Sequence, residues 1–156
     1  MQLLRNILSF GASTDEMVHL WNVFCRSVVE QSCVVWHSSL TQENREDIER
    51  TQKTFCKLIL KQKYENYENA LLKMNMVSLE KRRQEICLKF AKSGIKYEKL
   101  NDLFPTKFKE HEMKMRRTEM YNVEFANTER LKKASVITMQ NYLNDDAIET
   151  RKRNIG

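Results

Sequence analysis

The sequence predicts an all-α protein, a small helical bundle of about four main helices that begins with a helical hairpin. Two observations lead to this fold class. The 156 residues include three glycines and one proline, the two residue types that most disfavour a helix interior. Apolar residues also recur at steps of three and four over residues 17–90, the spacing of one helix face. We expect the bundle to span residues 1–100 and residues 101–156 to form a less regular, partly ordered basic extension.

The first predicted helix begins near Thr14 and Asp15, which suit an N-cap and a first turn. Polar residues occupy one of its faces. The opposite, apolar face carries Met17, Val18, Trp21, Phe24, Cys25, Val28 and Val29. We expect this helix to end near Val35 and Trp36.

A second helix is predicted after the polar break "HSSL", with Thr41 as its N-cap. Its first turns carry acidic residues, which the positive end of the helix dipole favours. Its inner face carries Ile48, Gln52, Phe55 and Ile59, widened by Cys56 and Leu58. Helices joined by a few residues pack antiparallel, so Trp36 lies at the corner of a hairpin. We assign structural roles to Trp21 and Trp36.

A short third helix has Tyr67, Leu71 and Met74 on one side. Ser78 caps a fourth helix, and Gly94 suits its C-terminal end. The apolar stripe of this fourth helix consists of Leu79, Ile86, Cys87 and Phe90. Arg83 falls inside that stripe. We expect Arg83 to be a partly buried structural residue, held by a carboxylate or by helix C-terminal carbonyls, because an unpaired buried charge costs several kcal/mol.

The opposite side of the fourth helix gathers a row of cations. We call this row the basic ridge; it consists of Lys81, Arg82, Lys89, Lys92 and Lys96. Residues 61–156 hold twenty-one Lys and Arg against fourteen Asp and Glu, whereas residues 1–60 hold six against seven. Two interpretations of the ridge stay open: a solvated helix face, or a surface that contacts phosphates.

Beyond residue 100 the helical pattern weakens. Leu103 and Phe104, before the single proline at Pro105, are expected to dock on the helices as an apolar plug. Residues 107–120 are highly charged and form either a solvated helix or a disordered segment. Residues 121–125 alternate apolar with polar, a weak strand signal with too few neighbours to build a sheet. The segment "VITMQNYLND" predicts a last, short helix.

The sequence offers no evident catalytic or cofactor site. The three histidines are scattered, the glycines stand alone and the cysteines form no CxxC pair, so Cys33 and His37 lack partners for a zinc site. In "YLNDD" the spacing differs from that of polymerase aspartates, and we expect Asp145 and Asp146 at a helix end or first turn. We expect no enzyme activity, metal, cofactor or small-molecule substrate. With no apolar run near the roughly 20 residues of a membrane span, we expect an intracellular protein, cytoplasmic or nuclear.

Four segments of the chain can be compared with known families: "LWNVFCRSVVEQSCVVWHSSLTQENREDIERTQKTFCKLIL", "YENYENALLKMNMVSLEKRRQEICLKFAKS", "LFP" and "RRTEMYNVEFANTERLKKASVITMQNYLN". In this order they resemble the region after the polymerase core in reverse transcriptases of LINE-type (non-LTR, jockey-like) retrotransposons. The matching residues include Phe24, Arg26, Ser27, Glu30, Trp36, Ile48, Glu49, Gln52, Tyr64, Tyr67, Leu71, Leu79, Arg82 and Arg83. The chain departs from the family pattern at Gln31, where a tyrosine is usual, and after Asn144, where a proline is missing.

The resemblance implies a helical region in the place of the thumb and C-terminal connection, which hold the template–product duplex. The metal-binding carboxylates of the polymerase core are outside this chain, and two-metal phosphoryl transfer needs them. The resemblance therefore implies a catalytically silent fragment, with the missing core and an RNA or RNA–DNA hybrid backbone as partners. The alternative is a helical protein-interaction module without nucleic-acid binding, for which Leu88 and Ile95, opposite the main stripe, would supply an exposed surface.

Overall fold

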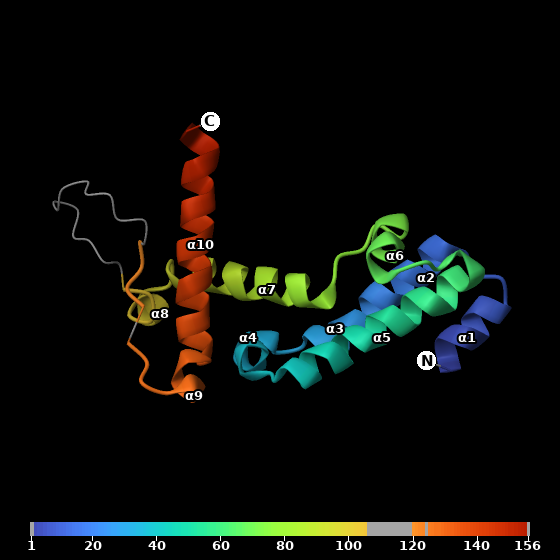
Figure 1. Cartoon of the computed structure of the whole chain (residues 1–156), viewed down its shortest axis with the longest axis horizontal. Helices are drawn as coiled ribbons and strands as arrows, with labels where there is room; N and C mark the ends of the chain where they lie inside the picture. Colours follow the sequence, from blue (N-terminus) through green and yellow to red (C-terminus); the bar gives the residue numbers. More distant parts are fainter. Residues whose placement is uncertain (1, 106–119, 124, 156) are drawn as a thin grey trace. The chain divides into compact units, whose positions relative to one another are not determined.

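The structure, a computed structural model, describes residues 2–105, 120–123 and 125–155. These residues are mostly helical and include no strand, which confirms the predicted all-α class for this part of the chain (Figure 1). They divide into two compact units. Unit 1 comprises Met1–Cys33 and Leu40–Arg83, and unit 2 comprises Val34–Ser39 and Gln84–Gly156. The boundary between the units falls inside one helix, α7 (Leu79–Gly94).

Unit 1 is built around a stacked aromatic pair. Its helices are α1 (Gln2–Ser9), α2 (Thr14–Leu20), α3 (Arg26–Glu30), α5 (Gln42–Leu60), α6 (Tyr67–Lys73) and the start of α7. Trp21 and Phe55 are fully buried, with ring centroids 4.5 Å apart and planes 20° from parallel. Such a pair contributes about 0.5–1.5 kcal/mol beyond the burial of its area. The same core contains Leu4, Met17, Cys56, Ala70, Met74 and Leu79.

The prediction of one helix from residue 14 to residue 36 is wrong. A π-helical turn, Trp21–Cys25, separates α2 from α3, and Ser32, with a φ of 53°, separates α3 from α4 (Cys33–Trp36). A π-turn inserts one residue and so rotates the following helix by about 100°. Cys25 and Val29 therefore pack against the core. Phe24 and Val28, predicted to face inward, are 65% and 70% exposed.

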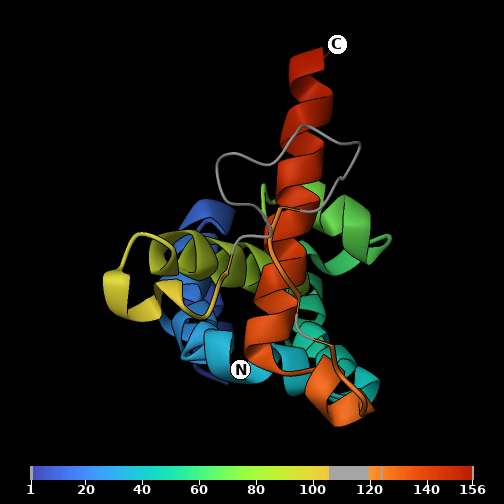
Figure 2. The same cartoon turned by 90° about the vertical axis from the view of Figure 1, so that its left-hand side faces the viewer.

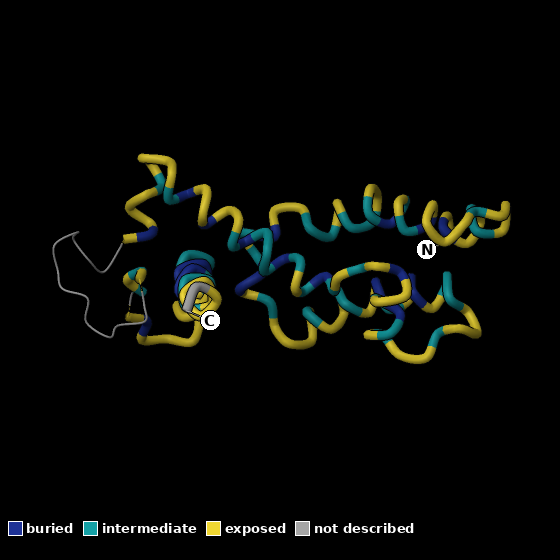
Figure 3. The backbone as a smooth tube through the Cα atoms, turned by 90° about the horizontal axis from the view of Figure 1, so that it is seen from above, coloured by how far each residue is buried: buried dark blue, intermediate teal, exposed yellow. Residues whose placement is uncertain are grey.

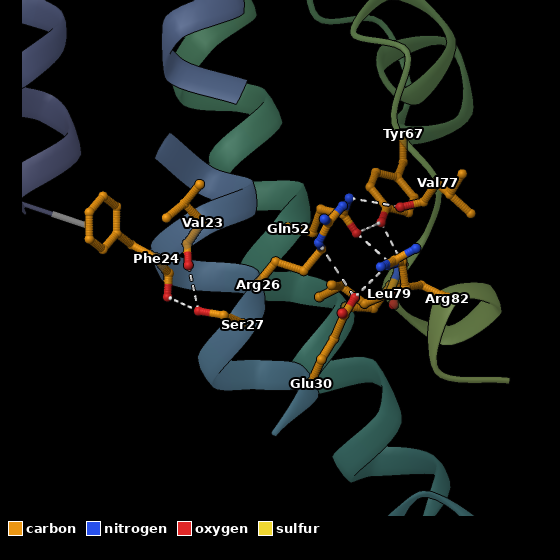
Figure 4. A network of polar contacts seen from close by, with 11 residues as sticks. Val23, Phe24, Arg26, Ser27, Glu30, Gln52, Tyr67, Val77, Leu79 and Arg82 are labelled. Atoms are coloured by element: carbon orange, nitrogen blue, oxygen red, sulfur yellow. Dashed lines mark hydrogen bonds and ion pairs between the residues drawn. The ribbon is translucent and has the colours of Figure 1, made fainter. Parts of the chain in front are cut away.

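Two serine side chains form hydrogen bonds with backbone groups, one at the N-terminus of α2 and one beside the π-helical turn. The Ser13 hydroxyl, one residue earlier than predicted, accepts a bond from the Glu16 N–H at 3.3 Å and caps α2. The Ser27 hydroxyl donates to the Val23 carbonyl at 2.6 Å, beside the π-turn (Figure 4). Back-bonding of this kind favours bends in helices.

The second, third and fourth predicted helices are confirmed as α5, α6 and α7. The Thr41 hydroxyl caps α5 by accepting from the Asn44 N–H at 3.2 Å. Asn66 caps α6, and the Ser78 hydroxyl accepts from the Lys81 N–H at 3.3 Å in the first turn of α7. The inner faces of α5 and α6 match the predicted residues: Gln52, Phe55, Cys56 and Met74 are buried, and Ile48, Ile59, Tyr67 and Leu71 pack against the core. On α7, Leu79 and Cys87 are buried as predicted, but Phe90 is 43% exposed, so its place in the predicted stripe is wrong.

Side chains from α5 bind the N-terminus of α7 (Figure 4). Gln52, fully buried, donates from Nε2 to the Val77 carbonyl and accepts the Leu79 N–H at Oε1, both at 3.0 Å. Glu49 accepts the same N–H at 3.2 Å. The Tyr67 hydroxyl donates to both side chains. Burial, and next the Glu49 carboxylate, raise the pKa of Tyr67, so its hydroxyl keeps the proton that these bonds require.

Unit 2 has its own apolar core. Its elements are the end of α4, the 3₁₀ turn His37–Ser39, the rest of α7, α8 (Glu98–Asn101), α9 (Glu129–Lys132) and α10 (Ser135–Ile155). The core residues are Cys87, Ala91, Phe104, Met139 and Leu143. Phe104 is buried, as the predicted plug requires, but Leu103 is 41% exposed. A Cβ at Gly94 would lie 2.9 Å from the Phe104 ring, so the absence of a side chain there allows the plug to seat.

The prediction of a short last helix is wrong, because α10 extends over 21 residues (Figure 2). Its buried positions run from Ile137 to Asn144, and residues 149–153 are all exposed. Figure 3 views this helix nearly along its axis, with the exposed end marked by the C-terminus. In the extension that begins at residue 101, residues 120–123 and 125–128 are irregular, whereas residues 135–155 are helical.

Residues 120–123 form no strand, although Tyr121 makes an isolated β-bridge and the Asn122 N–H donates to the Pro105 carbonyl at 2.8 Å. The Asn144 side chain of α10 binds the same segment. Asn144 Oδ1 accepts the N–H groups of Met120 and Tyr121 at 2.9 and 2.8 Å, and its Nδ2 donates to the Tyr121 carbonyl at 3.2 Å. This contact fixes the extended segment on α10. Most of the charged segment predicted over residues 107–120 lies outside the described residues.

Candidate nucleic-acid interface

The basic ridge is divided between the two units. Lys81 and Arg82 belong to unit 1, whereas Lys89, Lys92 and Lys96 belong to unit 2. Lys81, Lys89 and Lys92 lie on α7 at a spacing that keeps them on one side of the helix, and Lys96 lies in the turn that follows it. All four lysines are exposed, as predicted. Arg82 departs from the prediction, because it is only half-exposed.

Arg82 is held by an acidic partner that is distant in sequence. Its Nε lies 3.1 Å from Oε1 of Glu30, whose side chain is 12% exposed, and Arg26 approaches the same oxygen at 3.6 Å (Figure 4). Glu30 thus joins α3 to the first turns of α7 within unit 1. Because its charge is compensated there, Arg82 adds less positive potential to the surface than its neighbour Lys81.

Lys92 is also paired, within unit 2. Its Nζ lies 2.7 Å from Oδ2 of Asp146 on α10. The two side chains are 49% and 29% exposed, so the pair stabilises the unit by about 0–1 kcal/mol. Asp145 and Asp146, predicted at a helix end or a first turn, instead lie in the middle of α10, and Asp146 serves a structural contact.

Lys81, Lys89 and Lys96 make up the uncompensated part of the ridge. All three are exposed, and none forms an ion pair with another residue of the described ranges. An ammonium on a flexible stem can follow a phosphate backbone as a point charge. The arrangement suits contact with a polyanion independent of its sequence.

The residues predicted to be structural behave differently from one another. Trp21 is fully buried in the core of unit 1, and Trp36, at the end of α4, is half-buried. Arg83, predicted to be partly buried, is fully buried. Burial lowers the pKa of Arg83, and the carboxylates of Glu49 and Glu80 oppose that shift. These carboxylates supply the negative charge that a buried guanidinium requires.

The predicted interaction surface is occupied by the chain itself. Leu88 and Ile95 are half-buried and pack against the cluster that contains Phe104. Since both residues serve the core of unit 2, they supply no free apolar patch.

Two observations concern possible metal-binding and nucleophilic side chains in the described ranges. No cluster of three or more His, Cys, Asp or Glu residues able to hold a metal ion occurs in them. Burial raises the pKa of the Cys56 thiol to about 11, so this cysteine is a poor nucleophile at neutral pH. None of the helices in the part of the chain that the structure describes has the length and apolar character needed to span a bilayer.

Comparison with protein-family models, with curated proteins and with solved structures found no match to this chain.

Two basic residues escaped sequence reasoning. Arg130 lies on α9 and Lys133 directly after it, and both line a cavity of about 530 Å³ together with residues of the His37–Ser39 turn. The helix is too short for its apolar residues to show a period, and the turn is about ninety residues earlier in the chain. One signal was available: residues 130–144 of the sequence contain no acidic residue.

Proposed function

We propose that this chain is the catalytically silent, helical C-terminal region of a LINE-type reverse transcriptase and that it binds RNA or an RNA–DNA hybrid through the phosphate backbone. The observation that carries the binding is the exposure of uncompensated lysines on each unit, Lys81 on unit 1 and Lys89 and Lys96 on unit 2. The ordered series of motifs in the sequence supports the family assignment, and the all-α class agrees with it. The missing polymerase core of the parent protein would supply the chemistry.

A salt titration tests the binding. Fluorescence anisotropy of a labelled RNA–DNA hybrid with the full chain should give an affinity that falls steeply as salt rises, because each phosphate contact releases condensed counterions. Replacing Lys81, Lys89 and Lys96 together by glutamine should flatten the plot of log K against log salt by about 0.7–0.9 for each lost contact. Binding that is independent of salt, or absent at low salt, would contradict the proposal.

The matched control is Lys92→Gln on the same helix. Asp146 already compensates this lysine, so its loss should change the salt slope less than Lys89→Gln does. Equal effects of the two substitutions would mean that charge compensation does not select the contact residues. A separate assay with magnesium, nucleotides and a primed template should give no extension, and extension by the purified chain would contradict the assignment as a silent region.

The alternative function, a protein-interaction module, is less favoured because Leu88 and Ile95 are half-buried against the cluster that contains Phe104. Phe24 and Val28 are exposed in unit 1, but their chemistry identifies no particular partner. We therefore retain nucleic-acid binding as the function that the described residues favour.

A further inference from the structure

The cavity beside α9 differs from the basic ridge because several elements of unit 2 line it. Its lining consists of Ser38, Ser39, Thr128, Arg130, Leu131, Lys133, Ala134 and Ser135. Three segments supply these residues: the His37–Ser39 turn, α9 with its flanks, and the start of α10. Figures 1 and 2 show α9 at the foot of α10, and Figure 2 shows α4 and the turn that follows it beside the same end of α10.

The lining carries positive charge without acidic residues. Arg130 and Lys133 are exposed and form no ion pair with the residues of the described ranges. The neighbouring Lys132, which is not part of the lining, pairs instead with Glu129 at 2.6 Å. The local acid is thus engaged by the lysine outside the cavity, and the two cations of the lining remain available to an anion.

Hydrogen bonds fix the polar wall of the cavity. The Ser135 hydroxyl donates to the Val35 carbonyl at 2.7 Å, so the contact of 3.2 Å between Ser38 and Ser135 uses the Ser38 hydrogen. These bonds attach the turn to the start of α10. The Thr128 hydroxyl accepts the Leu131 N–H at 3.2 Å, which leaves its own hydrogen for a ligand oxygen.

The start of α10 adds backbone donors to this wall. The first N–H bonded within the helix is that of Thr138, which donates to the Ala134 carbonyl at 3.0 Å. Helix geometry directs the preceding N–H groups, including that of Ser135, out of the N-terminal end. The first turn contains no acidic residue, so the positive end of the helix dipole is not neutralised there.

We propose that this cavity binds a single phosphate group, with Arg130 and Lys133 as the charged contacts and Thr128 as a hydroxyl donor. A guanidinium, an ammonium, a hydroxyl and helix N–H groups in one lining supply donors that match the oxygens of a phosphate. The cavity volume exceeds that of one phosphate and leaves room for part of a nucleoside. The ligand is therefore a terminal phosphate, either of a free nucleotide or of a nucleic-acid end. This goes beyond the proposed function, because a ridge that follows a backbone makes no use of this cavity.

The test compares two oligonucleotides of the same sequence, one with a 5′-phosphate and one with a 5′-hydroxyl, by anisotropy with the full chain. The 5′-phosphate form should bind about tenfold more tightly, the ratio expected for one charge-assisted contact beyond the backbone. Arg130→Gln with Lys133→Gln should abolish this ratio. Lys132→Gln is the matched control, since its charge is already paired with Glu129, and it should preserve the ratio.

Two further arms identify the source of the phosphate and locate its site. If the pocket binds free nucleotides, a nucleoside 5′-monophosphate added as competitor should remove the preference for the 5′-phosphate oligonucleotide. If the preference persists in the presence of this competitor, the pocket is assigned to the ends of nucleic acids. Inorganic phosphate should shift the amide resonances of Ser39 and Ser135 in the wild-type chain and leave them unchanged in the variant that combines Arg130→Gln and Lys133→Gln. Far-UV circular dichroism verifies that this variant is folded.

Equal affinity for the two oligonucleotides, together with unshifted amides, would overturn the inference. An equal loss of preference in Lys132→Gln would also overturn it, because the effect would then be one of net charge. Both oligonucleotides share the same backbone contacts, so these contacts do not change the ratio of the two affinities. A wrong proposal for the cavity can therefore be distinguished from a wrong proposal for the ridge.

Discussion

Replacing Gln52 by leucine tests how the N-terminus of α7 is held in unit 1. The two side chains have similar volumes, so the substitution removes hydrogen bonds while creating little empty space. The Val77 carbonyl loses the donor at 3.0 Å, whereas the Leu79 N–H and the Tyr67 hydroxyl lose one of two acceptors and keep Glu49. A buried polar group left without a partner costs about 1–3 kcal/mol. With one group orphaned and two weakened, we expect a loss of about 2–4 kcal/mol in the free energy of unfolding of unit 1.

The measurement is urea unfolding followed by tryptophan fluorescence in a Trp36→Phe background, so that Trp21 in the core of unit 1 reports. The control is Gln42→Leu, the same change on the same helix. Gln42 is exposed and donates to Glu46, so its loss should stay within about 0.5 kcal/mol. Equal effects of the two substitutions would refute the role of Gln52 in binding the two helices together.

Three other perturbations have outcomes that the structure sets. Asn144→Leu removes the acceptor of two backbone N–H groups, and the amides of residues 120 and 121 should exchange with solvent at least tenfold faster; unchanged exchange would contradict this role. Gly94→Ala places a Cβ 2.9 Å from the Phe104 ring and should destabilise unit 2 by about 1–3 kcal/mol in thermal unfolding, whereas an unchanged midpoint would show that the plug shifts freely. Hydrogen bonds from the Ser13 backbone N–H and hydroxyl lower the pKa of Glu16 below its ordinary 4.5. The hydrogen bonds between Ser13 and Glu16 should therefore be intact above pH 4.5 and be lost as the pH falls through the lowered pKa of Glu16. NMR should then show fraying of α2 at low pH. Glu16→Gln should show the same fraying already at neutral pH.

The sequence predicted those helices whose determinants are local. A cap residue and an apolar face suffice for α5, α6 and α7, and the caps at Thr41 and Ser78 lie where the residue types place them. The break in the first helix was not predictable in this way, because the π-turn preserves helical spacing on both sides and only shifts the face. Trp21 packs against Phe55 before the turn, and the rotation at the turn leaves Phe24 exposed. The second half of α10 escaped prediction because a helix that is polar all round has no period to detect.

The same distinction applies to the candidate interface. Helical periodicity correctly places Lys81, Lys89 and Lys92 on an exposed face of α7, but it carries no information on which cations are compensated. Glu30 is 52 residues from Arg82 in the chain, and Asp146 is 54 residues from Lys92, yet each neutralises its partner within one unit. A count of lysines and arginines therefore overstates the charge that a polyanion would meet.

What decides between a solvated face and a binding surface is the set of cations left uncompensated, together with the donors that lie beside them. On the ridge, Lys81, Lys89 and Lys96 are uncompensated and exposed, which suits weak, salt-sensitive contact with any backbone. At the cavity, Arg130 and Lys133 are also exposed and uncompensated, but they share a lining with Ser38 and Ser135, which hydrogen bonds hold in place. Donors that are already held in place lower the entropy lost on binding and add geometry to charge. The two surfaces should consequently differ in kind: substitutions on the ridge should alter the salt dependence for every polyanion, and substitutions in the cavity should alter the preference for a terminal phosphate.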